Sequence, residues 1–170
     1  MRGCFMSIEF TPEQEIEVKR RTQQVIDHFE SKLAWQLKIM KEHFGEEAYQ
    51  VCVNAQSEDI RLHWSKVAEE IGGNSIEALI KCVWEPLSSK GYEYTMEKTG
   101  TSVQFTCTKC PAYDVAKRLG ITEQAFFMWC ENDIAVVEGF NPNIGFTRTK
   151  TLMQGHDCCN HFYYYKDTTL

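Results

Sequence analysis

The sequence predicts an α+β fold, in which a helical N-terminal half is followed by a β-β-α-α-β-β antiparallel sheet unit. Two observations carry this prediction. In the first half, apolar residues recur three or four positions apart, as helices with one buried face require. In the second half, apolar and polar residues alternate, as strands with one buried face require. We expect a single domain over residues 1–170, helical over 1–90 and with two hairpins and their intervening helices over 91–170.

The first predicted helix begins after Thr11. The Thr11 side chain can form a capping box with Gln14, and Pro12 suits the first helical position. Gly45 is expected to interrupt the helix. The predicted buried face is a stripe of apolar residues at Ile16, Val25, Ile26, Phe29, Leu33, Leu37 and Met40.

Two more helices are expected in the first half. The second covers residues 46–71 and ends at the Gly72-Gly73 pair. Asn74 or Ser75 caps the third, which ends near Pro86. If this helical half is exposed to solvent, it favours a homodimer.

Four strands are expected to form two hairpins. A glycine, Gly100 in the first hairpin and Gly155 in the second, lies between the strands of each. The predicted strands cover residues 92–98 and 102–109, then 144–152 and 159–165.

Two helices separate the hairpins. Pro111 opens the first of them and Gly120 closes it. Thr122 caps the second, which runs to about Val137 and stops before Gly139.

The composition limits the partners and the location of the protein. The net charge of -6 argues against a nucleic-acid partner, because phosphate contacts need a basic surface. No apolar run approaches the roughly 20 residues that cross a bilayer. The opening MRGCFMSIEF has too short an apolar stretch for a signal peptide. We therefore expect a cytoplasmic protein that binds no membrane.

The eight cysteines are unevenly distributed. In a reducing compartment, clustered cysteines indicate metal binding or catalysis rather than disulfides. Cys4, Cys52 and Cys82 stand alone, and we interpret the last two as small core residues. The other five lie near the C-terminus, at Cys107, Cys110, Cys130, Cys158 and Cys159.

The segment CTKCP is a C-x-x-C pair that follows a predicted strand and opens a helix. Such pairs occur in zinc sites and in dithiol redox proteins. Cys110 lies at the helix N-terminus, where the free N–H groups and the helix dipole favour a thiolate. Cys110 is therefore a stronger candidate for chemistry than Cys107.

Two other segments carry charged candidates. Cys130 and Asp133 are three positions apart and share a helix face. Glu138 is a candidate substrate-binding residue, because a negative charge at a helix C-terminus is unfavourable unless it has a use. Arg148 and Lys150 alternate along one predicted strand face, where Arg148 could bind a substrate carboxylate with two hydrogen bonds.

The segment GHDCCNHFYYY combines a turn with a strand. Strand alternation places Cys159, His161 and Tyr163 on one face. His156 lies in the turn before them and is a candidate metal ligand. Cys159 and His161 are the candidates for catalysis on this strand.

The segments CTKCPAYDVAKRLGI and WCENDIAVVEGFNPNIGFTRTKTLMQGHDCCNHFYYY together resemble the L-2-amino-thiazoline-4-carboxylic acid hydrolase family over about residues 105–165. Members typically show an R/K-C-P step, a Cys with a nearby Asp, an E-G-F/Y turn, an R-T-x-T strand and a final G-x-x-x-C-D/N strand. Asn160 stands where the family often has Asp, a departure that favours binding over catalysis. The matching residues are Lys109, Cys110, Pro111, Cys130, Asp133, Glu138, Gly139, Phe140, Arg148, Thr149, Thr151, Gly155, Cys159 and Asn160.

The resemblance implies a hydrolase that breaks a cyclic C–N or C–S bond and opens a thiazoline ring to N-carbamoyl-L-cysteine. In one route, a thiolate of Cys110 or Cys159 attacks the ring carbon between nitrogen and sulfur. His161 or Asp133 then relays protons. The substrate is a small molecule whose carboxylate Arg148 would bind.

In a second route, a divalent metal such as zinc activates water. Its ligands would be Cys110, Cys130 and Cys159, with His156 as a fourth candidate. The cysteines also allow two other functions. One is a non-catalytic sensor domain that binds a small molecule or zinc, and the other is a dithiol redox protein that uses Cys107 and Cys110.

Overall fold

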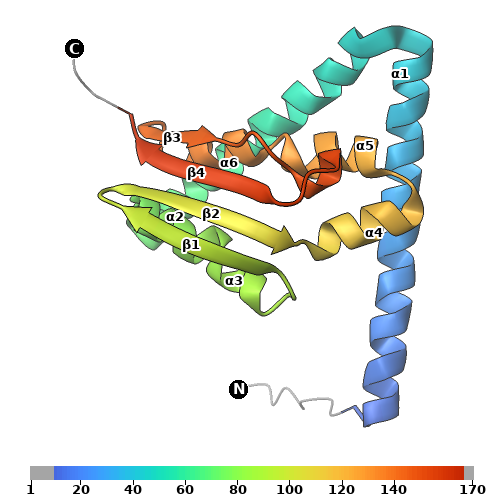
Figure 1. Cartoon of the computed structure of the whole chain (residues 1–170). Helices are drawn as coiled ribbons and strands as arrows, with labels where there is room; N and C mark the ends of the chain where they lie inside the picture. Colours follow the sequence, from blue (N-terminus) through green and yellow to red (C-terminus); the bar gives the residue numbers. More distant parts are fainter. Residues whose placement is uncertain (1–9, 167–170) are drawn as a thin grey trace, which may run out of the picture.

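The computed structural model describes residues 10–166, so Cys4 lies outside the described residues. A four-stranded antiparallel sheet carries helices against one face, and the long helix α1 lies outside these helices (Figure 1). This arrangement confirms the predicted α+β class. Among residues 10–166, no helix combines the length and the apolar character that crossing a bilayer requires.

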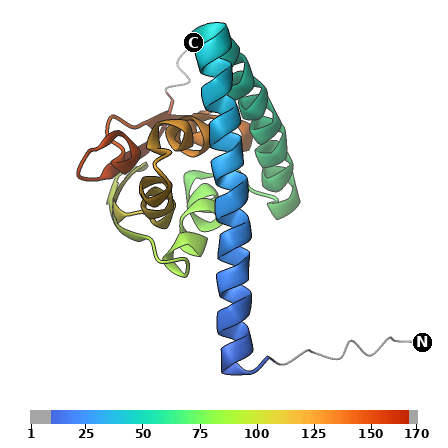
Figure 2. The same ribbon diagram turned by 90° about the vertical axis from the view of Figure 1, so that its right-hand side faces the viewer.

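Helix α1 (Pro12–Ile71) consists of two arms that meet at Gly45, where a φ of 79° and a ψ of -176° break the helix (Figure 2). The helix begins with the predicted capping box. Thr11 Oγ1 accepts a hydrogen bond from the Gln14 N–H, and Gln14 Oε1 accepts one from the Thr11 N–H. The second arm ends where Gly72 adopts the left-handed conformation.

The apolar stripe on the first arm is less buried than the sequence predicts. Ile16 and Phe29 are 67% and 68% exposed, because this end of the arm extends beyond the sheet and its helices (Figure 1). Leu37 and Met40, closer to Gly45, are half-buried. The arm meets the rest of the molecule at buried Ala34, which belongs to a small core with Ala116, Ile121, Ala125 and Met153.

Two short helices follow. Ser75, rather than Asn74, caps α2 (Ile76–Val83), because its Oγ accepts a hydrogen bond from the Ala78 N–H. Trp84 separates α2 from the four-residue α3 (Glu85–Ser88). Pro86 therefore lies inside a second helical turn and does not end the first one.

The sheet contains β1 (Glu93–Thr99), β2 (Ser102–Lys109), β3 (Ile144–Thr147) and β4 (Cys159–Tyr165) in the order β1-β2-β4-β3. The two predicted hairpins thus join through the central β2–β4 pair. Opposite each other in this pair stand Cys107 and Cys159, Phe105 and His161, and Val103 and Tyr163.

The second hairpin differs from its prediction, because β3 ends at Thr147 rather than continuing to residue 152. The Asn160 side chain accepts hydrogen bonds from the backbone N–H groups of Thr149 and Lys150, at 2.9 and 2.6 Å, and these replace strand pairing. A 3-10 helix, η2 (Leu152–Gln154), completes the connection before Gly155. Arg148 and Lys150 consequently do not share a strand face.

Helix α4 (Pro111–Leu119) begins and ends as predicted. The helix expected from Thr122 to Val137 is instead three pieces, α5 (Thr122–Ala125), the π-helix η1 (Phe126–Cys130) and α6 (Asp133–Phe140). Ile121 precedes α5 and makes no side-chain cap, so the predicted Thr122 cap is wrong. Buried Asn132 lies at the break, where its side chain bonds Ser57 and the Met128 carbonyl.

Gly139 does not stop α6, because it serves a close helix contact instead. A Cβ atom at Gly139 would lie 2.4 Å from the backbone oxygen of Arg61 on α1. The glycine therefore lets α6 approach the second arm of α1.

Cys52 and Cys82 are half-buried, and Cys82 packs against the core beneath the sheet.

Candidate functional site

A cavity of about 170 Å³, here called the inner cavity, lies between the buried face of β2 and β4 and the helices. It brings together five of the predicted site residues from four elements. Aromatic, thiol and acid side chains form its walls, namely Val83, Trp84, Leu87, Tyr92, Cys107, Cys110, Ala112, Trp129, Cys130, Asp133, Met153, Cys159, His161 and Tyr163.

His161 is held by a carboxylate on one side and by aromatic rings on the other. Its Nε2 lies 3.2 Å from Asp133 Oδ2, and its side chain is 12% exposed. The ring packs edge-on against Trp84 at 5.0 Å between centroids. The other ring nitrogen, Nδ1, is buried and has no hydrogen-bond partner among the described residues.

Asp133 joins His161 to a buried arginine. Arg148 Nη1 also donates to Asp133 Oδ2, and the Arg148 side chain is 9% exposed. The guanidinium lies over the rings of Phe126 and Phe146, at 5.8 and 5.9 Å from their centroids. Arg148 therefore stands behind Asp133 and does not line the inner cavity.

The cysteine side chains that line the inner cavity stay protonated, because their surroundings raise the pKa of each thiol. Burial raises the pKa of Cys107 to about 12. It also raises the pKa of Cys130, where the Asp133 carboxylate adds to the effect, and the pKa of Cys159. Each thiol therefore needs a base before it can act as a nucleophile.

Cys110 illustrates why the sequence prediction of a ready thiolate is wrong. The N–H groups of Ala112 and Tyr113 at the start of α4 lower its pKa, as does the Tyr92 hydroxyl. Burial is the larger effect, however, and it raises the pKa of Cys110 overall. Cys110 still has more groups able to stabilise its thiolate than Cys159, whose pKa the Leu152 N–H lowers.

The predicted metal ligands do not form a metal site. Within residues 10–166, no three His, Cys, Asp or Glu side chains are grouped so that they could hold a metal ion. Cys110, Cys130 and Cys159 share the inner cavity without forming such a group. His156 lies in an exposed turn, with its Nδ1 at 3.1 Å from the Thr151 carbonyl.

Two other charged candidates are engaged elsewhere. Glu138 pairs with Arg61 at 2.8 Å and so links α6 to the second arm of α1, outside the cavity walls. Lys150 pairs with Asp157 at 3.1 Å on the surface. Neither is placed to bind a ligand in the inner cavity.

Asn160 supports the site from the opposite sheet face. Its side-chain oxygen accepts hydrogen bonds from the Thr149 and Lys150 N–H groups, as an Asp oxygen could. Its amide nitrogen donates to Thr149 Oγ1 at 2.9 Å. These bonds fix the chain directly after Arg148. The position thus holds a loop, and Asn meets this need without a negative charge.

Sequence reasoning missed the aromatic walls of the inner cavity. Trp84 and Tyr163 are joined by a hydrogen bond of 3.0 Å, and Trp84 stacks on Phe105 at 4.1 Å. Trp84 lies near the end of the third predicted helix and Tyr92 begins the first predicted strand, so each reads as an ordinary core residue. In the structure Trp84 follows α2 and Tyr92 precedes β1, and the wall forms where Trp84 stacks on Phe105 of β2.

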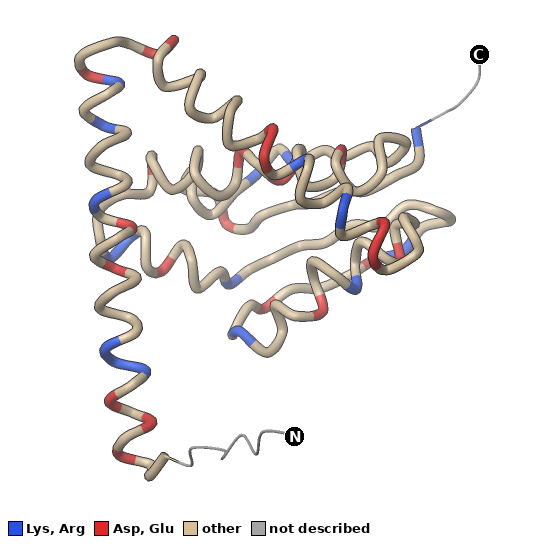
Figure 3. The backbone as a smooth tube through the Cα atoms, turned by 180° about the vertical axis from the view of Figure 1, so that it is seen from behind, with Lys and Arg blue, Asp and Glu red and all other residues tan. Residues whose placement is uncertain are grey.

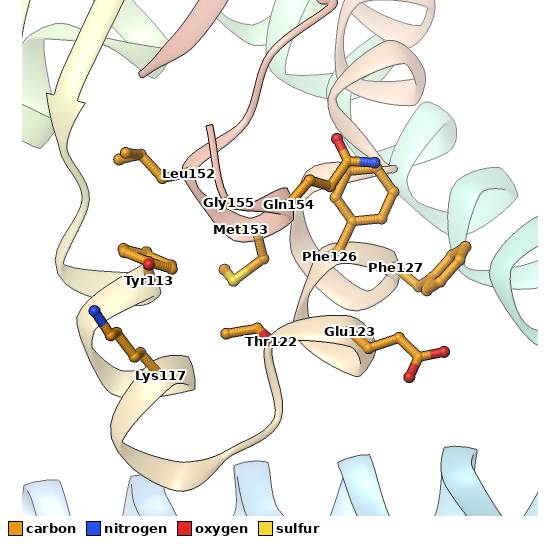
Figure 4. A pocket seen from close by; sticks show the side chains of 10 residues that line it. All are labelled: Tyr113, Lys117, Thr122, Glu123, Phe126, Phe127, Leu152, Met153, Gln154 and Gly155. Carbon is orange, nitrogen blue, oxygen red and sulfur yellow. The ribbon is translucent and has the colours of Figure 1, made fainter. Parts of the chain in front are cut away.

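A second hollow, here called the outer pocket, opens beside α4, α5 and η2 and has a volume of about 620 Å³ (Figure 4). Figure 4 shows Met153 between Tyr113 of α4 and Phe126 of η1. Met153 lines both the outer pocket and the inner cavity. It therefore stands between the two spaces.

Comparisons with known proteins give one family and one fold. The model of the L-2-amino-thiazoline-4-carboxylic acid hydrolase family matches residues 28–163. No curated protein matches the chain. The crystal structure of the phenol-responsive sensory domain of the transcription activator PoxR with phenol is similar, with a TM-score of 0.52 and 13% identity over 78% of this chain and 72% of that one. At this identity, the likeness shows the fold alone.

Proposed function

The chain belongs to the L-2-amino-thiazoline-4-carboxylic acid hydrolase family, and we propose that it opens the ring of a small cyclic amidine in the inner cavity. The observation that carries the proposal is the Arg148–Asp133–His161 chain at the cavity wall. It ends in a histidine nitrogen that has no partner among the described residues.

His161 is the proton acceptor. A carboxylate beside Nε2 favours the tautomer with its proton there, which leaves the lone pair on Nδ1. Asp133 stabilises the imidazolium that forms, and Arg148 holds Asp133 in place. The buried, protonated thiols around the cavity require a base of this kind.

Cys110 is the preferred nucleophile. Its thiolate would be stabilised by the start of α4 and by Tyr92, whereas Cys159 has the Leu152 N–H. After His161 takes the thiol proton, sulfur bonds to the ring carbon, and the ring C–S bond breaks to release a thiol. Water then displaces Cys110, so that the carbon gains oxygen as a urea and the enzyme thiol is restored.

Substrate recognition uses Asp133, the half of the buried ion pair that lines the inner cavity. Among the described residues that line the cavity, Asp133 is the acidic one, and no Lys or Arg joins it. A protonated amidine would bind Asp133. Arg148, predicted to bind the substrate carboxylate, does not line the cavity and keeps its place behind Asp133 in this proposal.

Ring opening of L-2-amino-thiazoline-4-carboxylate by the purified full chain tests this function, with N-carbamoyl-L-cysteine measured by chromatography. We expect Cys110→Ser to lower kcat/KM by about 100-fold or more, since serine is a much poorer nucleophile. Cys158→Ser is the matched control, because Cys158 does not line the cavity. Full activity in Cys110→Ser would contradict the thiol route.

A second candidate function is a small-molecule sensor. The walls of the inner cavity are mostly apolar and aromatic, and the fold is shared with the phenol-responsive domain. Calorimetry distinguishes the two functions. Binding of the thiazoline or of phenol without any turnover would favour the sensor.

A further inference from the structure

The first arm of α1 carries an apolar stripe that the other residues within 10–166 leave exposed. Val18, Val25, Ile26, Phe29 and Leu33 fall on one side of the helix and are between 44% and 68% exposed. In both ribbon views, this end of the arm extends away from the sheet and the short helices (Figures 1 and 2). We call residues 12–33 the free arm.

Contacts with the body use other positions on the same arm. Asp27 pairs with Arg118 at 2.8 Å, Glu30 is half-buried, and Ala34 is buried in a core. Because Asp27 and Ala34 are seven residues apart, they mark one helix face, and the exposed stripe lies beside it. The stripe is therefore additional to the face that holds the arm in place.

An open apolar groove continues the stripe toward Gly45. The groove consists of two hollows between the two arms of α1 and η1, with volumes of about 630 and 550 Å³. Both hollows are lined by Leu33, Gln36, Gln56 and Met128. The stripe and the groove thus form one apolar surface along the first arm, the kind of surface that marks an interaction site. An arm about 33 Å long that pairs along its length would bury on the order of 800 Å² per chain, as a standard stable interface does.

The charges of the first arm alternate in groups along its length (Figure 3). An acidic group is followed by a basic group, and the same order then repeats. Two such arms in antiparallel orientation place opposite charges together, whereas two parallel arms in register place like charges together. The groups are Glu13, Glu15 and Glu17, then Lys19, Arg20 and Arg21, then Asp27 and Glu30, then Lys32, Lys38 and Lys41. Asp27 and Lys41 already pair with Arg118 and Glu123, so the acidic start of the arm and Lys32 and Lys38 are the charges that a partner copy would meet.

We propose that two copies of this chain form a dimer in which the free arms pack antiparallel. The apolar stripes form the centre of the interface. The acidic start of each arm lies beside the basic stretch of the other, next to the groove. The arm residues changed in the tests below do not line the inner cavity, so the dimer stands or falls independently of the hydrolase.

Sedimentation velocity of the full chain tests the dimer. At tens of micromolar protein, we expect a species of twice the chain mass. Val25→Glu combined with Phe29→Glu should raise the dimer Kd at least about tenfold, since buried charges disrupt an apolar interface. Val51→Glu is the matched control, because Val51 is 62% exposed on the second arm. A monomeric wild type, or equal Kd values for the arm and control variants, would overturn the proposal.

Charge reversal tests the orientation with residues that are not buried, and circular dichroism checks that each variant is folded. Replacing Glu13, Glu15 and Glu17 with Lys should raise the dimer Kd about tenfold at low salt. Adding Lys32→Glu and Lys38→Glu should restore the original Kd to within about threefold, because opposite charges again face each other. A Kd that the second set of changes raises further would rule out the antiparallel arrangement.

Discussion

The inner cavity and the outer pocket lie on two sides of Met153, yet they differ in how their polar groups are used. The outer pocket is the larger, at about 620 Å³ against about 170 Å³. Its Lys117 lies over the Tyr113 ring and its Glu123 pairs with Lys41 at 2.7 Å. In the inner cavity, by contrast, a buried histidine nitrogen has no partner among the described residues. The unpartnered histidine nitrogen beside a carboxylate, rather than the cavity volume, therefore marks the inner cavity as the candidate reactive site.

The largest expected difference between the two spaces is in catalysis. We expect His161→Gln, in the inner cavity, to lower kcat by about a thousandfold, because the proton acceptor is lost. Lys117→Gln, in the outer pocket, should change kcat by less than about twofold. Steady-state kinetics on the thiazoline substrate measures both values. A loss in Lys117→Gln as large as that in His161→Gln would move the active site to the outer pocket.

A smaller effect on activity is expected from Asn160, which holds the chain between β3 and η2 next to Arg148. Asn160→Ala removes the acceptor for the Thr149 and Lys150 N–H groups and should lower kcat/KM about tenfold, because Arg148 loses its fixed position. Asn160→Asp keeps an acceptor oxygen there and should stay within about threefold of the wild type. If Asp raised the activity strongly instead, the position would need its negative charge.

The smallest expected effect is on stability at high pH, and it comes from the thiols that line the inner cavity but not the outer pocket. The pKa of Cys107 is raised to about 12 in the fold from an ordinary value near 9. Above pH 9 the unfolded chain therefore loses a proton that the folded chain keeps, and the free energy of unfolding falls. We expect a loss of about 1 kcal/mol between pH 8 and pH 10. Urea denaturation should show a smaller loss in Cys107→Val, and an equal loss would assign the effect elsewhere.

Local signals in the sequence predicted much of the fold correctly. The capping box at Thr11, the break at Gly45 and the α4 boundaries depend on neighbouring residues alone, and the structure has all three. The failures occur where distant segments meet. The sequence could not indicate that Gly139 faces the Arg61 backbone, so Gly139 was predicted to end a helix. It also could not indicate that Asn132 bonds Ser57 of α1, so the break before α6 was not predicted.

For the candidate site, alternation along β4 correctly placed Cys159 and His161 on one face, because side chains in a strand alternate whatever surrounds them. Burial of that face depends on β2, on α6 and on the aromatic residues that pack there. The spacing of Cys130 and Asp133 was likewise readable from one helix, whereas the pairing of Asp133 with Arg148 required β3 to end early.

The sequence by itself determined the α+β class, the family and which side chains share a strand or helix face. These properties depend on residue order, backbone geometry and neighbours a few positions away. Only the packing of distant segments buries the thiols and keeps them protonated, pairs Arg148 with Asp133, and leaves the apolar stripe of the free arm exposed among residues 10–166. Desolvation and ion pairing depend on residues far apart in the chain, and packing determines which of them meet.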